Sequence, residues 1–136
     1  MYLFDTDILS NLLRRMPSTT LIAKLASVPL EQQFTSSITL GELVYGAHRI
    51  GTRGAALLDR LEKAHLPNLP VLPFDAAAAR RYGEVRAELE HRGLPIGDAD
   101  LRIAAIALVR DLTVVTGNLR HFQRVPGLRV ENWLEE

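Results

Sequence analysis

Four polar side chains in this sequence have the types and positions expected of ligands for a divalent cation. They are Asp5, Glu42, Asp100 and Asn118. Three carboxylates and an amide that converged would repel one another and lose hydration, at a cost of several kcal/mol, unless a cation neutralised them. All-oxygen ligation completed by water is typical of Mg²⁺ or Mn²⁺. Such an ion activates water and holds phosphate oxygens, so the chemistry to expect is metal-assisted phosphodiester hydrolysis.

The segments around these residues predict short strands that alternate with helices. We expect strands at Tyr2–Phe4, Phe34–Ile38, Val71–Leu72, Thr113–Thr116 and Leu128–Val130. We expect helices from about Ile8 to Leu13, Ser18 to Val28, Thr39 to Gly51, Ala55 to His65, Ala76 to His91 and Asp98 to Arg110. Short strands joined by long helices predict parallel pairing through helical crossovers. The expected fold is a three-layer α/β/α sandwich with a short, mostly parallel central sheet.

The strand positions explain why distant acids should meet. In parallel sheets of this kind, ligands bind at the carboxyl ends of the strands. Asp5 follows the first predicted strand, Glu42 comes just after the second, and Asn118 follows the strand at Thr113–Thr116. Asp100 begins the helix that precedes this last strand. The sequence therefore places all four at one edge of the sheet.

Some of these acids also have a purely structural interpretation. A capping box would begin at Thr39, with Glu42 reaching back to the first amide of the helix. Asp98 suits the N-cap of the next helix, and Asp100 is favoured in its first turn by the helix dipole. Asp7 is a candidate cap as well.

Asp5 is harder to explain as a purely structural residue. An acid that directly ends an apolar strand has low strand propensity, and we expect it to be partly buried.

Composition narrows the class of protein. The chain has 136 residues with 47% hydrophobic and 24% charged side chains, which predicts one globular domain over residues 1–136. The absence of cysteine excludes disulfides, thiolate zinc sites and cysteine nucleophiles. The longest apolar run, Ile103–Val109, is far shorter than the ~20 residues of a membrane span, and no signal peptide precedes Asp5. We expect a soluble, cytoplasmic protein that does not contact a membrane.

Four segments together resemble a known family. Leu3–Ser10, Ser37–Gly46 and Pro95–Ala105 are similar to the three acidic motifs of VapC-type PIN domains, and Val114–Phe122 is similar to the closing motif of that family. The segments occur in the family's order and at its usual separations, and they cover nearly the whole chain. The resemblance implies a PIN-domain ribonuclease of the VapC toxin family, from a type II toxin-antitoxin system.

The resemblance also implies roles for individual residues. Asp5, Glu42 and Asp100 correspond to the metal-binding acids, and Asn118 stands where many relatives have aspartate. Asp100 is preferred to Asp98 because it precedes Leu-Arg-Ile-Ala-Ala as the family acid does. The secondary candidates are Asp98, Thr6, Thr116 and Asp7.

In these roles, Thr6 and Thr116 match the hydroxyl positions that orient Asp5 or a bound water. Asp7 stands where the family commonly has asparagine. The neutral Asn118 is compatible with a single-metal site or with weak binding of a second ion.

The implied reaction is cleavage of structured RNA such as tRNA, recognised at single-stranded loops. Asp5 and Asp100 would hold Mg²⁺ or Mn²⁺, while Glu42 or another acid orients the attacking water. Arginine, which accounts for 14 of the 16 basic residues, can pair two phosphate oxygens at once. The candidate RNA contacts are Arg14, Arg15, Arg49, Arg102 and Arg120.

The implied partners are a VapB-like antitoxin, an RNA substrate and a second copy of the chain. The C-terminal segment of the antitoxin would occupy the acidic groove, and another part of it would bind operator DNA, so that a larger assembly can form on that DNA.

Two alternative functions are also compatible with the sequence. The neutral Asn118 also suits a catalytically weak PIN binding module within a DNA-binding regulatory complex. The segment Asp5-Thr6-Asp7 after a strand superficially resembles the signature of dehalogenase-like phosphatases. That fold needs a downstream lysine after a strand, and the two lysines, Lys24 and Lys63, do not follow predicted strands.

Overall fold

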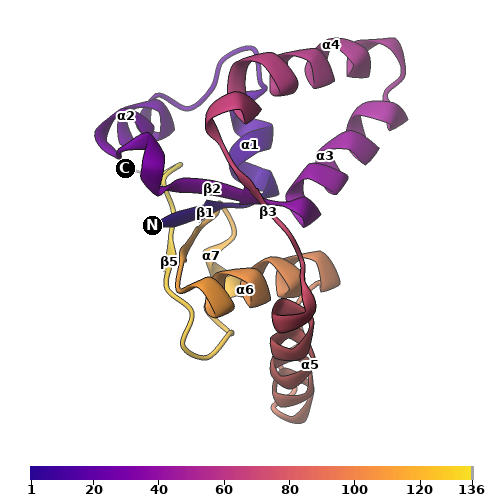
Figure 1. Ribbon diagram of the computed structural model, residues 1–136, viewed down its shortest axis with the longest axis vertical. Helices are drawn as coiled ribbons and strands as arrows, with labels where there is room; N and C mark the ends of the chain where they lie inside the picture. The colour runs from indigo at the N-terminus through magenta and orange to yellow at the C-terminus, as the bar shows by residue number, and fades with distance from the viewer. Residues whose placement is uncertain (136) are drawn as a thin grey trace.

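A computed structural model of the chain describes residues 1–135, and its centre is a five-stranded parallel sheet (Figure 1). The strands are β1 (Tyr2–Phe4), β2 (Gln33–Ser36), β3 (Val71–Leu72), β4 (Thr113–Val115) and β5 (Val130–Glu131). Their order across the sheet is β3-β2-β1-β4-β5, and every adjacent pair is parallel. The predicted parallel sheet is therefore confirmed, with β1 at its centre.

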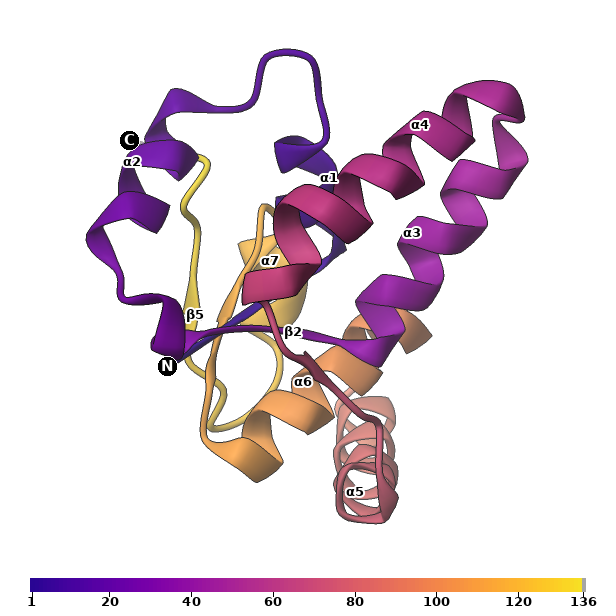
Figure 2. The same cartoon turned by 45° about the horizontal axis from the view of Figure 1, so that its top comes forward.

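Helices provide the crossovers between these strands. They are α1 (Thr6–Leu12), α2 (Thr19–Ser27), α3 (Ser37–Arg49), α4 (Thr52–Arg60), α5 (Ala76–His91), α6 (Asp98–Arg110) and α7 (Leu119–Phe122). Short 3-10 turns lie at Leu30–Gln32 and Leu66–Asn68, and a π-helical turn at Leu61–His65 continues α4. Figure 2 shows α3 and α4 running side by side away from the sheet.

The two faces of the sheet carry separate hydrophobic clusters. Successive strand residues point to opposite faces. Leu3 and Val114 pack with the apolar sides of α5, α6 and α7, whereas Phe4 and Val115 pack with α1, α2 and Trp133. This alternation produces the predicted three-layer α/β/α sandwich.

Two predicted N-caps are wrong. Helix α3 begins at Ser37 because Ser36 is its N-cap and accepts a hydrogen bond from the Thr39 amide at 3.0 Å. Glu42 therefore lies beyond the first turn, and the capping-box interpretation fails. Helix α6 has Gly97 as its N-cap, and Asp98 is its first residue rather than its cap.

Helices α1 and α4 begin two and three residues before the predicted Ile8 and Ala55, whereas the boundaries of α2, α5 and α6 agree closely with the sequence. Ser18 caps α2 by accepting from the Leu21 amide at 3.2 Å, and α5 spans the predicted residues. Asp7 lies in the first turn of α1, whereas the N-cap is Asp5. Strand β2 ends earlier than predicted because Ser37 and Ile38 already belong to α3, and β4 ends at Val115, one residue before the predicted Thr116.

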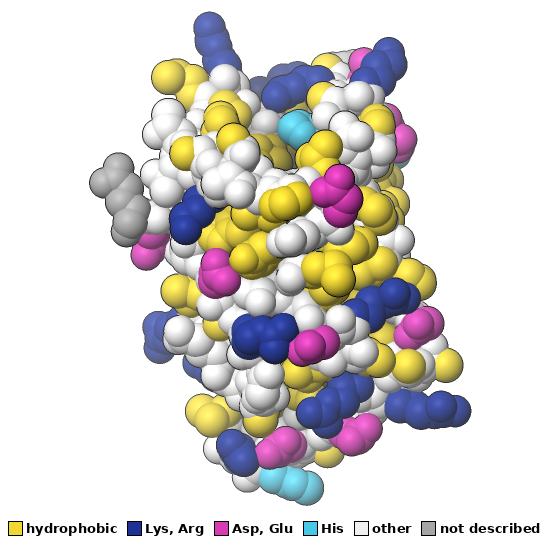
Figure 3. All heavy atoms as spheres, turned by 60° about the vertical axis from the view of Figure 1, so that its left-hand side comes forward, with side chains coloured by type: hydrophobic (Ala, Val, Ile, Leu, Met, Phe, Trp, Pro, Cys, Tyr) yellow, Lys and Arg dark blue, Asp and Glu magenta, His cyan; other side chains and the backbone are white. Residues whose placement is uncertain are grey.

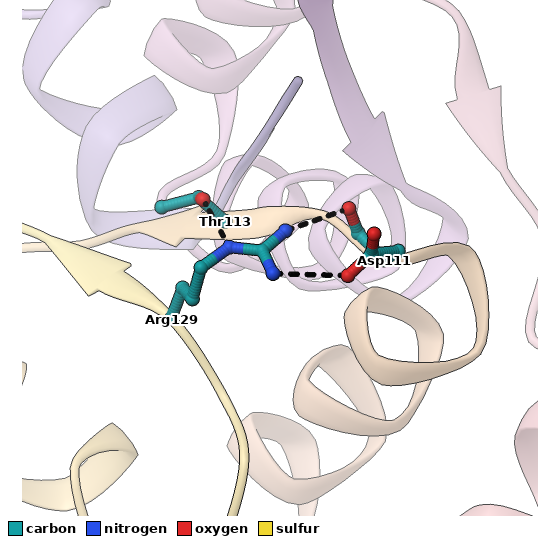
Figure 4. Close-up of polar contacts among 3 residues, drawn as sticks. All are labelled: Asp111, Thr113 and Arg129. Carbon is teal, nitrogen blue, oxygen red and sulfur yellow. Dashed lines mark hydrogen bonds and ion pairs between the residues drawn. The ribbon is translucent and has the colours of Figure 1, made fainter.

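Arg129 lies at the amino-terminal ends of β4 and β5, on the side of the sheet away from the predicted metal-binding acids. Asp111 ends α6 with a φ of 57°. Arg129 donates to the Asp111 carboxylate at 3.0 Å, to the Asp111 carbonyl at 2.9 Å and to the Thr113 hydroxyl at 3.3 Å (Figure 4). These contacts fix β5 beside β4 and leave the carboxyl ends of both strands free for other residues.

Adding a single methyl group at Gly54 is expected to lower the stability of the protein strongly. A Cβ at this position would lie 1.7 Å from the Ala47 carbonyl oxygen, in the backbone of α3. Because no side chain can move aside, the two helices must separate. We expect Gly54→Ala to lower the free energy of unfolding by about 3 kcal/mol, measured by urea unfolding.

Gly83→Ala in α5 is the matched control for this substitution. Nothing lies within 4 Å of a Cβ at Gly83, so alanine there should stabilise the helix by up to about 1 kcal/mol. Equal stabilities of the two variants would contradict the close contact between α3 and α4.

Candidate active site

Asp5 is a buried carboxylate at the carboxyl end of the central strand. Its side chain is 2% exposed, and Oδ1 accepts a hydrogen bond from the Ile8 amide at 3.1 Å. Burial raises the pKa of Asp5 to about 7, with smaller increases from the charges of Asp7 and Asp100. The Thr116 hydroxyl and the Ile8 amide lower the pKa by hydrogen bonding. The Thr116 hydroxyl therefore lies beside the Asp5 carboxylate.

Asp100 lies in the first turn of α6, within range of the same charges. Burial raises its pKa, and the charges of Glu42 and Asp7 raise it further, whereas His121 lowers it. The fold therefore brings acidic residues from α3 and α6 to the end of β1, beside Asp5 and Asp7. Four carboxylates influence one another across this edge of the sheet.

Glu42 is held by a hydrogen bond from α1. The Thr6 hydroxyl donates to Glu42 Oε1, which connects the exposed glutamate to the residue that follows Asp5. Glu42 also borders both the groove beside α4 and a hollow lined by Asp98 and Arg102. These contacts fix its position without any role in capping.

Asp98 and Arg102 have partners outside the acidic cluster. The Tyr82 hydroxyl donates to Asp98, and Arg102 forms an ion pair with Asp98 at 2.9 Å. The Tyr82 hydrogen bond is the main cause of a lowered Asp98 pKa, to which Arg102 and Arg86 also contribute. Arg102 further lies 5.5 Å from the ring centroids of Phe74 and Tyr82. The hydrogen bond between Tyr82 and Asp98 joins α5 to α6. Because Asp98 is engaged in this contact, Asp100 is favoured over Asp98 as the acid that faces the site.

Asn118 and His121 complete the edge beyond β4. The Asn118 backbone amide donates to the Thr116 hydroxyl oxygen at 2.8 Å, and its side-chain nitrogen lies 2.8 Å from His121 Nδ1. The sequence motif contained His121 but gave it no role. Its spacing of three residues from Asn118 on a short helix was the available signal.

The predicted arginines fall into different environments. Arg14 and Arg15 line a groove of about 820 Å³ between α1, α3 and α4, together with Arg53 and Arg60, which the sequence reasoning missed. Arg49 and Arg120 are exposed, and Arg49 lies 5.7 Å from the Tyr45 ring centroid.

The groove is therefore the main concentration of arginine beside the acids. On the face drawn in Figure 3, basic and acidic side chains are interspersed. That face is not uniformly basic, in keeping with a net charge of zero.

The donor chemistry at this edge fits a hydrated hard cation. Among residues 1–135, no three His, Asp or Glu side chains are arranged to hold one ion directly. Mg²⁺ commonly binds through one or two carboxylates and keeps several waters, so it does not require such a group. The raised pKa values of Asp5 and Asp100 show the electrostatic cost that a cation would relieve.

The pKa of Asp5 predicts how stability depends on pH. Because the folded-state pKa of about 7 exceeds the ordinary aspartate pKa of 3.8, the folded state binds this proton more tightly than the unfolded state. Stability from this group is present below about pH 4 and is lost as pH rises to about 7. We expect the metal-free protein to unfold at a lower temperature at about pH 8 than at about pH 5.5, and added Mn²⁺ to recover more stability at the higher pH. A melting temperature that rises over this range in chelator would contradict the prediction.

Comparison with known proteins identifies the family. The family model described as PIN domain matches residues 2–128. The chain therefore belongs to the PIN-domain family.

Individual relatives define the branch of that family. The tRNA(fMet)-specific endonuclease VapC of Salmonella typhimurium is 45% identical over 100 residues, which are 72% of this chain and 73% of that protein. The structure of FitAcB from Neisseria gonorrhoeae matches with a TM-score of 0.90 at 34% identity, over 100% of both chains. DNA-bound VapBC from Salmonella typhimurium matches with a TM-score of 0.87 at 37% identity, over 97% of both. These similarities place the chain among the VapC ribonuclease toxins, as its motifs predict.

Two further observations bear on the sequence predictions. The phosphatase alternative is wrong, since Lys24 lies in α2 and Lys63 forms an ion pair with Asp59 at 3.0 Å. Within residues 1–135, none of the helices has the length and apolar character needed to cross a bilayer.

Proposed function

We propose that this chain is a metal-dependent endoribonuclease toxin that hydrolyses phosphodiester bonds in structured RNA such as tRNA. The observation that carries the proposal is the meeting of Asp5 and Asp100, both with raised pKa values, at the carboxyl end of the central strand. The printed name of the Salmonella relative supports tRNA as the substrate class.

Each residue of the site has a defined part in this reaction. Asp5 and Asp100 would hold Mg²⁺ or Mn²⁺, and a hydrogen bond from the Thr116 hydroxyl would keep the Asp5 carboxylate oriented. A bound divalent ion supplies charge stabilisation for the phosphate and lowers the pKa of water. Glu42, fixed by Thr6, orients the attacking water and accepts its hydrogen bond.

The groove arginines give the site its affinity for a polyanion. Arg14 and Arg15 line the same groove as Thr6 and Glu42, so phosphates held there lie next to the acids. The guanidinium fork pairs two phosphate oxygens, which fixes the strand as well as attracting it. Arg49 and Arg120, which are exposed, stay candidate RNA contacts, and Arg102 is held in an ion pair with Asp98.

The test is cleavage of a tRNA pool by the purified chain, followed by sequencing of the RNA ends. Cleavage is expected with Mg²⁺ or Mn²⁺ and should stop when a chelator is added. Cleavage that continues in chelator would overturn metal dependence. No cleavage under any metal condition, with intact formation of a DNA complex, would instead favour the catalytically weak binding module that the neutral Asn118 suggested.

Glu42→Gln separates the catalytic interpretation from a structural one. Because Ser36 rather than Glu42 caps α3, the substitution should leave the helix and the unfolding midpoint unchanged. We expect the cleavage rate to fall about 10²-fold, as for loss of a group that orients water. Full activity of the variant in single-turnover assays would remove Glu42 from the mechanism.

An antitoxin and operator DNA are the proposed partners. The similar FitAcB and DNA-bound VapBC structures support them. The groove has apolar walls that include Leu13, Leu43 and Leu57, with arginines at its margin, so an amphipathic acidic segment fits it. An antitoxin bound there would cover Glu42 and exclude RNA. Homodimerisation stays a prediction from the family resemblance.

A further inference from the structure

Asn118 and His121 form a side-chain pair whose donor and acceptor can be assigned. Asn118 Nδ2 lies 2.8 Å from His121 Nδ1, and both residues are half-buried. An amide nitrogen carries two hydrogens and does not accept hydrogen bonds, so Asn118 is the donor. His121 Nδ1 is therefore the acceptor, which requires that this ring nitrogen carries no hydrogen.

The Asn118 backbone is fixed at the same edge of the sheet as the acids. Its amide donates to Thr116 Oγ1 at 2.8 Å, and Thr116 in turn hydrogen-bonds Asp5. At the intervening residue, Gly117, a Cβ would lie 3.5 Å from Asp7 Oδ2. The backbone is thus held by Thr116 and the side-chain amide by His121, which leaves Asn118 little conformational freedom.

We propose that His121 is a positioning residue that holds the Asn118 amide nitrogen and so leaves the Asn118 carbonyl oxygen for the metal-binding edge. This inference rests on the proposed metal-dependent function. Among the described residues, Asn118 Oδ1 accepts no side-chain or capping hydrogen bond. Amide oxygens are ligands for hard cations, whereas an amide NH₂ group would repel one.

The orientation of the Asn118 amide matters because several carboxylates already lie at this edge of the sheet. At this edge the charges of Asp7 and Asp100 already raise the pKa of Asp5, and those of Glu42 and Asp7 raise the pKa of Asp100. A fifth carboxylate at position 118 would increase that repulsion in the metal-free state. An oriented amide supplies an oxygen without a charge, provided that a neighbour such as His121 prevents it from turning over.

The first test measures the tautomer of His121 in the full-length, metal-free protein. Long-range ¹H–¹⁵N correlation spectra distinguish a protonated from an unprotonated ring nitrogen. We expect Nδ1 of His121 without hydrogen and Nε2 with hydrogen. A hydrogen on Nδ1 would mean that the amide oxygen faces the ring, and it would overturn the inference.

The second test is a double-mutant cycle on Mn²⁺ affinity, measured from the electron paramagnetic resonance of free Mn²⁺. His121→Ala should weaken binding about 10-fold, as for an outer residue that orients a metal ligand, and Asn118→Ala, which removes the amide oxygen itself, should weaken binding at least as much. The double variant should bind no more weakly than Asn118→Ala, because His121 acts through Asn118. Additive losses, or no loss on His121→Ala, would overturn the proposal.

Two further variants serve as controls in the same measurement. His91→Ala, at the exposed end of α5, should keep the wild-type affinity. His121→Gln offers an amide oxygen that can accept from Asn118, so it should recover part of the affinity lost with alanine. A His121→Gln variant no better than alanine, although folded by circular dichroism, would count against the hydrogen bond.

These outcomes separate the inference from the function on which it rests. Wild-type protein that binds no Mn²⁺ would overturn the proposed metal dependence and the role of Asn118 together. Wild-type binding with a hydrogen on Nδ1 of His121 would overturn only the positioning role.

Discussion

Asp100→Asn is expected to lower the rate of RNA cleavage about 10³-fold while leaving the protein folded. A divalent ion contributes several kcal/mol of charge stabilisation in the transition state, and about 4 kcal/mol corresponds to this factor. Asp100 is the α6 residue whose charge interacts with Glu42 and Asp7. Replacing it by a neutral isostere weakens ion binding without removing a hydrophobic contact. Single-turnover cleavage of a tRNA substrate measures the effect.

Asp98→Asn is the matched control, two residues away in the same helical turn. Asp98 pairs with Tyr82 and Arg102, so its loss should loosen the contact between α5 and α6. Because this ion pair is largely exposed, we expect less than about 1 kcal/mol of destabilisation and cleavage within about 10-fold of wild type. If Asp98→Asn were the inactive variant and Asp100→Asn the active one, the assignment of the third acid would be reversed.

The positions of the acids were predictable because they depend on topology. The apolar run before Asp5, the β-branched run before Asn118 and the long helices between them predict a parallel sheet. In a parallel sheet the carboxyl ends of strands share one edge. The predicted helix α5, which stops before Gly93, agrees with the structure because its local sequence signals and its packing favour the same boundaries.

The detailed contacts of the site depend on distances that the sequence does not contain. Ser36 and Thr39 both fit a helix start, and only the end of β2 decides that Ser36 is the cap. Asp98 fits an N-cap equally well until Tyr82, 16 residues earlier, is placed beside it. The partnership of Thr6 with Glu42 joins residues 36 apart and has no local signal. Side-chain pairing across elements therefore had to come from the structure.

Asp5→Asn is expected to abolish cleavage and to stabilise the metal-free protein at the same time. Its carboxylate is buried, and its pKa of about 7 means that ionisation above neutral pH opposes folding. A shift of about three pKa units corresponds to up to about 4 kcal/mol, which the neutral amide would recover at about pH 8. The amide oxygen can still accept the hydrogen bond from Ile8, so the cap of α1 survives. Urea unfolding in chelator at about pH 5 and about pH 8 measures the gain, which should be less than half as large at the lower pH.

The opposite signs of these two effects connect Asp5 to catalysis rather than to stability. A carboxylate kept only as a helix cap would be replaced by asparagine with little change in either property. A carboxylate kept for a cation lowers the stability of the free protein and regains it when the ion binds. Saturating Mn²⁺ should therefore raise the unfolding midpoint of the wild type but not that of Asp5→Asn. If both proteins responded equally to Mn²⁺, the ion would be bound elsewhere, and the buried charge at the end of β1 would need another explanation.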